Sequence, residues 1–543
     1  MKKFLLGLFA LSFVFIAVAC GGDSEWSIDD LPEPRFTPNA AIPSWQTDVD
    51  FTAELSWYVN YLWWPEHNMG DSWVTEQMFN DLNVRIHWTS GNTEMLNAMI
   101  AGGDLPDIIT VGGYMADIVS EAHEFAIPLN VLADMYDPYF FTAVSPQVRA
   151  WMTRESGNIY GLPNEAVTSE EISAGAGTTG AGFLVRGDIY EAIGSPDMTT
   201  PEGFLQALRD AVAHSPQDSH GRPLVGFSGD FVNISTVDNG AFSGVLQDFL
   251  AIPVLNADGT WYDRDSHPAY LEWMLVFRQA MDEGLMSMDQ FSHDNETVNN
   301  EFETGRYFAI MTGNTNDFAS RMNNIAGGDT PEQQMIPIYG PRNNGASHTL
   351  PAGSINGWTH TFITQNARDP QTAIQVITYL WSDHGQMLQQ FGIEGVTYTY
   401  VNGVPTWNED IAAHHANDYY DFRDVWGMRT FWQLRRPGFF ANQGVVPVGT
   451  PHAEVQTFYI PFNHPRLEFV NLEPTSGQIQ RDLEAIDLAR SQAIADLLTA
   501  SSDAEATQIW ENFLSFRDNY DWNSIVEYRN RRLNENRAQL GMN

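Results

Sequence analysis

The sequence predicts an α/β protein with a helical C-terminal region. Over residues 51–111, apolar runs typical of strands alternate with amphipathic helices, and this strand–helix–strand–helix–strand order is typical of a parallel α/β sheet. Further on, apolar side chains recur at helical spacing, and about the last hundred residues are mostly of this kind. The chain has 543 residues and no internal repeat, so it is long enough for two or three domains with large cores.

Local patterns define the first elements. In chain order we expect a strand at 51–58, a helix at 75–82, a strand at 84–88, a helix that ends at Gly102-Gly103, and a buried strand at 106–111. Ser90-Gly91-Asn92 offers an N-cap to the second of these helices. Later helices are expected where apolar residues share one face: Tyr270, Met274, Phe277 and Met281; Ile374, Ile377 and Trp381; Ile479, Leu483 and Ile486.

Cys20 is the only cysteine of the chain, and it ends a hydrophobic leader. Two lysines precede an uncharged run, and the small residues Ala17-Val18-Ala19 stand directly before the thiol. This pattern predicts a lipoprotein signal peptide over residues 1–19 and a lipid-anchored chain that begins at Cys20. A plain signal peptide with a chance cysteine is the weaker interpretation, because Cys20 has no second thiol to pair with. We therefore expect a cell-membrane protein that faces away from the cytoplasm.

The net charge of the chain restricts the kinds of molecule that it can bind. The formal charge is −42, and every cation after Lys3 is an arginine or a histidine. Such an acidic surface repels phosphate backbones, so we expect no nucleic-acid binding. It also keeps the folded part away from anionic lipid headgroups, which leaves the acyl anchor as the expected membrane contact.

Five separated stretches resemble the bacterial extracellular solute-binding proteins of family 1, the lipoprotein receptors of carbohydrate ABC importers. Residues 96–109 are similar to the helix–SGDLPDI–strand signature of that family, with Gly102 where serine is usual. The other four are residues 160–164 at a lobe crossing, residues 184–204, residues 302–311, and residues 392–398, which resemble the GIEGVHY element of LipO-like members. Each motif is weak alone, but five in the right order are specific.

The resemblance implies a two-lobed clamp of the periplasmic-binding-protein type, in which each lobe is a mixed sheet flanked by helices. It implies a first lobe at 49–165 with 355–408 and a second lobe at 166–354 with 409–543. Residues 20–48, rich in proline and polar residues, are expected to form a flexible tether. It also implies a monomer that captures a carbohydrate, an oligosaccharide by expectation, and delivers it to ABC permease subunits without a cofactor of its own.

Aromatic residues make up 13% of the chain and include 17 tryptophans, which suits a sugar ligand. Pyranose C–H faces stack on aromatic rings, and hydroxyl groups need polar partners. The ligand-binding candidates follow predicted strands or lie near the lobe crossings: Trp63, Trp64, Tyr114, Asn164, Glu165, Asn314 and Trp358. Trp426 and Trp432 belong to an aromatic-rich stretch that the sequence does not place.

No hydrolase, nucleotide-binding or metalloprotease motif occurs, so we expect a protein without catalytic or metal-binding residues. His414-His415 is interpreted as a solvated loop, and Asn256-Ala257-Asp258-Gly259 as a tight turn, because His267 stands where a calcium loop needs glutamate. Two alternatives stay open. One is a secreted glycosidase or lyase, since many carboxylates are present. The other is a peptide-binding receptor of the same clamp type.

Overall fold

The computed structural model describes residues 27–47, 52–64, 71–113, 115–173, 175–229, 240–428, 430–443 and 450–542. The chain divides into a unit of residues 1–33 and a unit of residues 34–543. Every strand described below belongs to the second unit. Cys20 and Tyr114 lie outside the described residues, so their predicted roles stay predictions. Within the described residues, no helix is long and apolar enough to span a bilayer.

The first sheet has the strand order β2-β1-β3-β10-β4. Its strands are β1 (Ala53–Val59), β2 (Val84–Ser90), β3 (Ile108–Gly112), β4 (Gly161–Pro163) and β10 (Thr359–Ile363). Strand β1 pairs in parallel with both β2 and β3, which confirms the parallel sheet expected for residues 51–111. Strand β10 comes from a distant part of the chain and runs antiparallel between β3 and β4.

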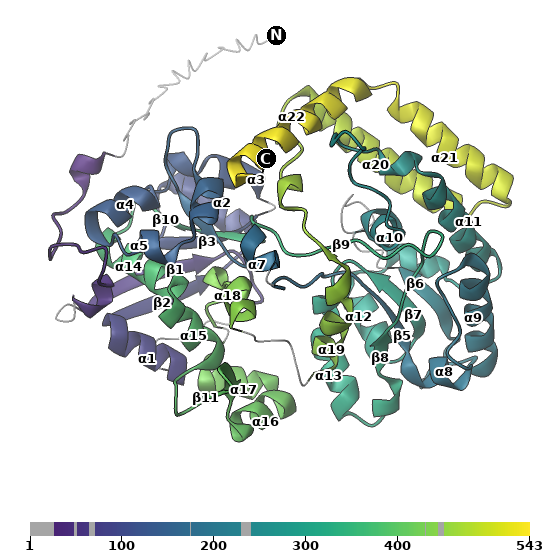
Figure 1. Cartoon of the computed structure of the whole chain (residues 1–543), viewed down its shortest axis with the longest axis horizontal. Coiled ribbons are helices and arrows are strands. Elements are labelled where there is room, and N and C mark those ends of the chain that lie inside the picture. Colours follow the sequence, from purple (N-terminus) through teal and green to yellow (C-terminus); the bar gives the residue numbers. More distant parts are fainter. Residues whose placement is uncertain are drawn as a thin grey trace, which may run out of the picture. The chain divides into compact units, whose positions relative to one another are not determined.

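Helices surround this sheet and form the first lobe (Figure 1). They are α1 (Trp73–Leu82), α2 (Thr93–Gly102), α3 (Ala116–Ser120), α4 (Leu129–Tyr136), α5 (Phe140–Ala143), α6 (Pro146–Met152), α14 (Pro370–Trp381) and α15 (Asp383–Phe391). Helix α2 begins as predicted, because the Asn92 side chain accepts a hydrogen bond from the backbone N–H of Met95. It ends at Gly103, whose φ of 66° is a left-handed conformation that glycine adopts without strain.

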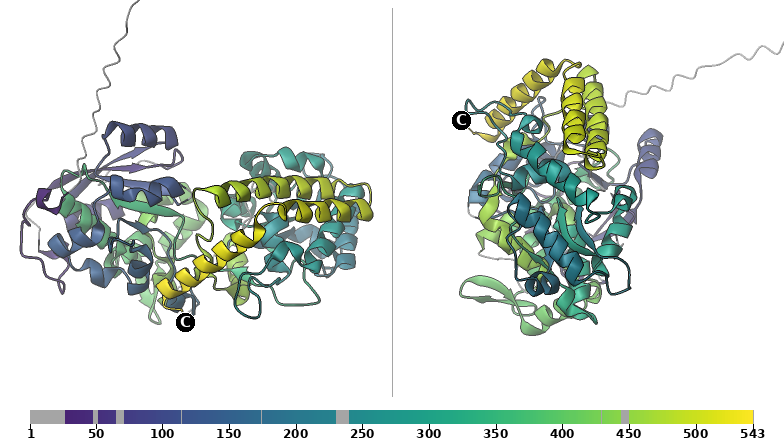
Figure 2. Two further views of the ribbon diagram at one scale, coloured as in Figure 1. Left: turned by 90° about the horizontal axis from the view of Figure 1, so that it is seen from above. Right: turned by 90° about the vertical axis from the view of Figure 1, so that its right-hand side faces the viewer.

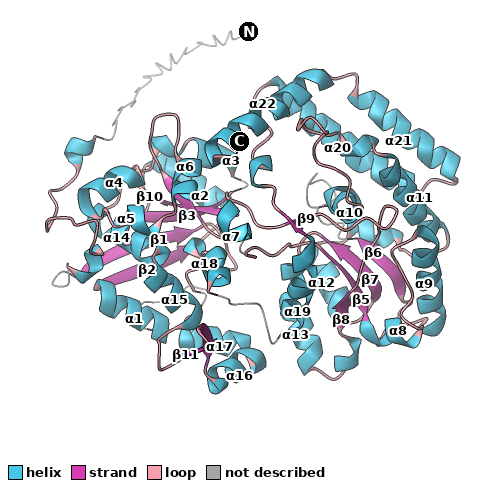
Figure 3. Cartoon of the chain, viewed as in Figure 1, coloured by secondary structure: helices cyan, strands magenta, loops and turns pink. Residues whose placement is uncertain are grey.

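The second sheet has the order β6-β7-β5-β8 and forms a separate group of strands (Figure 3). Its strands are β5 (Gly182–Arg186), β6 (Val225–Gly229), β7 (Tyr307–Thr312) and β8 (Met335–Pro337). Strand β7 pairs in parallel with β6, and β5 runs antiparallel to both β7 and β8. Strands β5, β6 and β7 are buried along their whole length, so apolar helices must cover both faces.

The helices of the second lobe supply that cover. They are α8 (Gly187–Ala192), α9 (Pro201–His214), α10 (Leu246–Phe249), α11 (Pro268–Asp282), α12 (Asn295–Glu303), α13 (Ala319–Gly327) and α19 (Pro451–Tyr459). The apolar face predicted for α11 enters the core, where Tyr270, Met274 and Phe277 are fully buried. One hydrophobic cluster joins these helices to the sheet.

Three long helices end the chain: α20 (Gln478–Leu498), α21 (Asp503–Arg517) and α22 (Trp522–Leu540). Helices α20 and α21 lie side by side and pack on α11 (Figure 2). The end of α22 reaches the first lobe, where the Gln539 side chain donates to the Ala150 and Trp151 carbonyls of α6. The predicted helical C-terminal region is confirmed, and it bonds to both lobes.

The boundary between lobes needs one correction. Residues 409–442 were expected in the second lobe, but they carry α16 (Glu409–Asn417), α17 (Tyr419–Trp426), η10 (Trp432–Leu434) and α18 (Pro437–Asn442). Helix α17 contacts α1, and η10 contacts β4, β10 and α14, so this stretch belongs to the first lobe. The hairpin of β11 (Tyr398–Val401) and β12 (Val404–Trp407) precedes it. The chain returns to the second lobe at α19, which contacts α13 and β8.

The expected tether also ends earlier than residue 48. Residues 34–47 pack against the first lobe, where Arg35 forms an ion pair of 2.9 Å with Asp369. Trp45 is buried and meets the rings of Tyr139 and Tyr379 edge-on. An aromatic anchor of this size fixes the segment because its burial releases much apolar surface from water.

Candidate functional site

The carboxyl ends of β1, β3 and β4 and the start of β10 meet at one edge of the first sheet. The register places them there because β1, β3 and β4 share one direction, and β10 runs against them. Open α/β sheets bind ligands at this edge, where side chains that follow the strands converge. Five of the seven predicted site residues stand here: Trp63 and Trp64 after β1, Asn164 and Glu165 after β4, and Trp358 before β10.

Tyr61, Trp63, Trp358 and Trp432 form a connected aromatic cluster, named here the tryptophan platform. The ring centroids of Trp63 and Trp432 are 5.4 Å apart, and those of Trp63 and Trp358 are 6.4 Å apart. Tyr61 packs against all three tryptophans. Trp63 is 60% exposed and Trp358 is 39% exposed. Large flat rings held in place with their surfaces open to solvent are suited to stacking against a sugar ring.

Trp64 does not offer a free surface, contrary to its predicted role in stacking. It is only 4% exposed and packs edge-on against Trp432 at 5.4 Å and against Trp88 at 6.0 Å. Its neighbour Trp63 points outward instead. Trp64 therefore helps to hold Trp432, one ring of the platform, in place.

Asn164 holds the start of β10 in place. Its Oδ1 accepts hydrogen bonds from the backbone N–H groups of Trp358 at 3.0 Å and Thr359 at 2.9 Å. The side chain is fully buried. The structure thus gives Asn164 a role in positioning Trp358, and its expected contact with ligand stays a prediction.

Glu165 ties the first crossing to the segment that carries Trp432. Its backbone N–H donates to the Arg435 carbonyl at 2.7 Å, and its carboxylate forms an ion pair with the Arg435 guanidinium at 3.0 Å. The residue has a φ of 48°, a left-handed conformation that is uncommon outside glycine, and the bonds to Arg435 hold it there. The Glu165 carboxylate remains partly exposed at the rim of the platform.

His360, the second residue of β10, adds no charge to this edge. It is fully buried, and desolvation lowers the pKa of its imidazole to about 4. The ring is therefore neutral at physiological pH and brings no positive charge to this part of the sheet.

Asn314 follows β7 and lies at the edge of the second sheet where β7 ends. Asn314 bonds locally, since its side chain donates to Asp317 at 2.9 Å and accepts from Asn316 at 3.0 Å. Sequence reasoning did not find Tyr339, which follows β8 at the same edge, is 47% exposed and packs against Phe458 at 5.3 Å. An exposed tyrosine after a short strand gives little sequence signal.

The aromatic-rich stretch after residue 420 divides between two places. Trp432 joins the platform, whereas Trp426 lies elsewhere and packs against Trp73 at 5.4 Å.

His414 lies on α16, not in a loop as expected. Its Nε2 contacts Asp421 at 2.8 Å and its Nδ1 accepts from the Trp426 indole, so both ring nitrogens are engaged. Asn256 forms the predicted tight turn, with its N–H donating to the Thr260 carbonyl.

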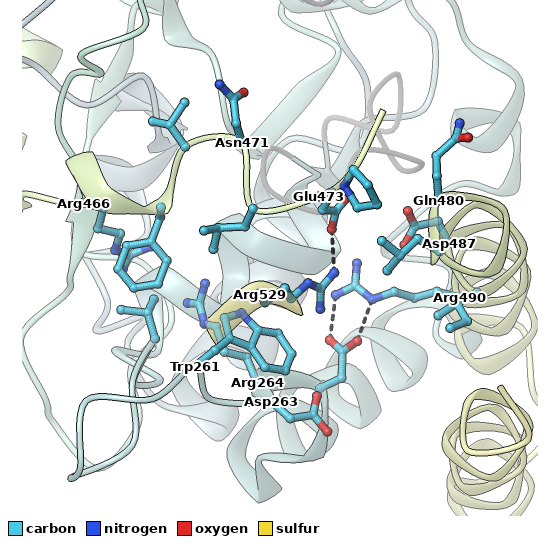
Figure 4. A pocket seen from close by; sticks show the side chains of 18 of the residues that line it. Trp261, Asp263, Arg264, Arg466, Asn471, Glu473, Gln480, Asp487, Arg490 and Arg529 are labelled. Atoms are coloured by element: carbon cyan, nitrogen blue, oxygen red, sulfur yellow. Dashed lines mark hydrogen bonds and ion pairs between the residues drawn. The ribbon is translucent and has the colours of Figure 1, made fainter. Parts of the chain in front are cut away.

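A cavity of about 700 Å³ lies next to the segment that follows β3 of the first sheet. It begins at Met115, which follows β3, and extends between the 466–475 segment and the helices α20 and α22. Met115 stands two residues after Gly113, whose backbone N–H donates to the Trp358 carbonyl at 2.8 Å. The volume of the cavity lies within the range of ligand pockets. Trp261, Asn471 and Gln480 are among the side chains that line it (Figure 4).

Two α/β lobes joined by crossing segments define the fold of the ABC-transporter extracellular solute-binding proteins, as the sequence resemblance predicted. Three solved structures with this fold match nearly the whole chain. An extracellular solute-binding protein from Bifidobacterium longum subsp. infantis matches with a TM-score of 0.63 and 14% identity, over 90% of this chain and 99% of its own. The Streptococcus pneumoniae ABC-transporter substrate-binding protein FusA, in complex with kestose, gives 0.61 and 14%, over 89% and 99%.

The third is the alginate-binding protein AlgQ2 without calcium ion, with a TM-score of 0.59 and 18% identity over 89% of this chain and 98% of its own. At these identities the similarity establishes the fold. No protein-family model and no curated protein matches the sequence. All three similar structures are described as binding proteins.

Proposed function

We propose that the chain is a lipid-anchored, extracytoplasmic receptor that binds an oligosaccharide between its two lobes and delivers it to an ABC permease. The tryptophan platform is the observation that carries this proposal. It stands at the sheet edge where this fold can take a ligand, and it keeps two indole surfaces open to solvent, Trp63 and Trp358.

The adjoining cavity supports a ligand longer than one sugar ring. Gly113 bonds to the backbone of Trp358, and Met115, two residues further along the chain, lines the cavity. Sugar hydroxyl groups both donate and accept hydrogen bonds, so they suit a lining that mixes carboxylates, amides and guanidiniums.

Transport requires a change of conformation, which the proposal assigns to the crossing segments. A ligand that contacts both lobes shifts the population toward the closed form, because only that form makes all contacts. The closed receptor would dock on its permease, and ATP would be hydrolysed by a separate cytoplasmic subunit. The receptor itself performs no catalysis.

A ligand screen tests the proposal. Purified protein that lacks the leader is heated with a panel of oligosaccharides, and a binder raises the unfolding temperature because it stabilises the folded state by RT ln(1 + [L]/Kd). Hits are confirmed by calorimetric titration. Binding of peptides but no glycan would favour the peptide receptor, and steady release of cleaved glycan would favour the secreted enzyme.

The lipid anchor has its own test. Cells that express the full chain are labelled with a fatty-acid analogue, and the label should appear on the parent chain and be absent from Cys20→Ala. Labelled Cys20→Ala protein in the membrane fraction would refute the anchor.

A further inference from the structure

The arginines that line the cavity beside Met115 are all engaged in ion pairs. Each of the five contacts a carboxylate: Arg264 and Arg466 contact Asp248 at 2.5 and 2.7 Å, Arg490 contacts Asp265 at 2.7 Å, Arg517 contacts Asp263 at 2.9 Å, and Arg529 contacts Glu473 at 2.5 Å. A guanidinium that is already bound to a carboxylate within the protein has little positive charge left for a ligand.

Further contacts hold the guanidiniums of Arg490 and Arg529, whose ion pairs Figure 4 shows as dashed lines. Arg490 donates to both oxygens of Asp265, at 3.0 and 2.7 Å, and is almost fully buried. The guanidinium of Arg529 lies over the ring of Trp261 at 4.6 Å and near that of Trp522 at 5.7 Å. Neither arginine can turn toward a ligand without breaking these contacts.

The cavity also carries acidic groups beyond those pairs. Asp117 and Asp487 line it, and neither forms an ion pair within the described part of the chain. Burial, followed by the nearby Glu473 carboxylate, raises the pKa of Asp487 to about 7. The surroundings thus already disfavour one more negative charge.

Resting on the proposed function, we infer that this cavity selects electrically neutral saccharides and rejects those that carry carboxylate or sulfate groups. A hydroxyl group can donate to Asp487 or Glu473 and accept from a paired guanidinium without loss of the existing contacts. A uronate carboxylate would instead enter a site where every guanidinium already contacts a carboxylate, next to further acidic groups.

The test uses the tightest neutral glycan from the screen and its C6-oxidised form, which has carboxylates in place of CH2OH groups but the same length and linkage. Titration calorimetry at pH 8 measures both affinities. The oxidised form should bind at least about tenfold more weakly, because a buried charge is left unpaired. Equal or tighter binding of the oxidised form would overturn the inference.

Glu473→Gln locates the selection in the cavity. This variant keeps the shape of residue 473 but frees the Arg529 guanidinium, which Trp261 and Trp522 still hold. The oxidised glycan should then bind about tenfold or more tightly than it binds the parent, with little change for the neutral glycan. A gain of affinity cannot come from misfolding.

Glu283→Gln is the matched control, since it breaks the pair of 2.6 Å between Glu283, the residue after α11, and Arg209 on α9. Neither residue lines the cavity. If Glu473→Gln leaves discrimination as it was, or if Glu283→Gln changes it equally, the cavity does not select the ligand. If neither glycan form binds the parent, the proposed function itself fails, and this result is distinct from a failure of selectivity.

Discussion

The indole rings of Trp358 and Trp432 lie face to face, with 4.6 Å between their centroids and 7° between their planes. Trp358 precedes a strand of the first sheet, and Trp432 begins η10 in the segment that follows the β11–β12 hairpin. Trp63 packs against both rings, so each of the three tryptophans of the platform contacts the other two. Two distant parts of the chain thus cooperate to keep one aromatic surface rigid.

Trp63→Ala and Trp358→Ala are expected to weaken glycan binding by about 1.5–3 kcal/mol each, the scale for burying a large apolar side chain. Both rings are partly exposed, so both variants should stay folded. Calorimetric titration with the glycan from the screen measures the loss. Leu62→Ala is the control, since Leu62 is 72% exposed beside Trp63. Parent-like affinity in both tryptophan variants would place the ligand elsewhere.

Trp64→Ala should act on stability, unlike Trp63→Ala. Trp64 is almost fully buried, so its removal leaves a cavity, and the free energy of unfolding should fall by about 3–5 kcal/mol. Trp63→Ala should change it by less than about 1 kcal/mol, as expected for an exposed site. Urea unfolding of both variants provides the comparison. A similar loss in both would mean that the two neighbours are equally buried.

The sequence predicts the features that depend on neighbouring residues, and it does not predict contacts between segments that are far apart in the chain. Local periodicity predicts β1, β2 and β3, because a strand or helix pattern is complete within ten residues. It also places Trp63 directly after a strand, whereas the position of Trp358 near a lobe crossing follows from the family resemblance.

Local patterns do not reveal partners from distant segments. Nothing near Trp432 shows that it packs on Trp358, and nothing near Arg435 shows that it pairs with Glu165. The outward orientation of Trp63 and the burial of Trp64 are likewise decided by tertiary packing, since both residues have the same sequence neighbourhood.

The buried Asp265–Arg490 pair should be far more important for stability than a pair at the surface. Asp265→Asn removes the carboxylate to which the buried Arg490 guanidinium donates, which should cost about 3–5 kcal/mol of unfolding free energy. The pair also joins the loop before α11 to α20. Chemical denaturation measures the effect. Glu283→Gln, which breaks the partly exposed Arg209 pair, should cost less than about 1 kcal/mol. Equal costs would show that burial does not set the contribution.

The carboxyl group of Asp137, which lies near Ser44 of the 34–47 segment, should make the stability of the folded protein depend on pH. It is fully buried near Ser44 and Thr378, and desolvation raises the pKa of its carboxyl to about 6, partly offset by those hydroxyl groups. In the unfolded chain the group titrates near 3.8. Because the folded state holds the proton more tightly, stability falls as the pH rises from about 4 to about 6. Above that range the full cost is about 3 kcal/mol.

Asp137→Asn should therefore stabilise the protein at pH 8 by up to about 3 kcal/mol, since the amide carries no charge to desolvate. The gain should disappear near pH 4, where the aspartate is protonated in the folded state. Asp134→Asn makes the same substitution at an exposed position on α4 and serves as the control. Urea unfolding of the three proteins across this pH range gives the result. A constant difference between parent and Asp137→Asn at every pH would mean that the carboxyl is charged throughout.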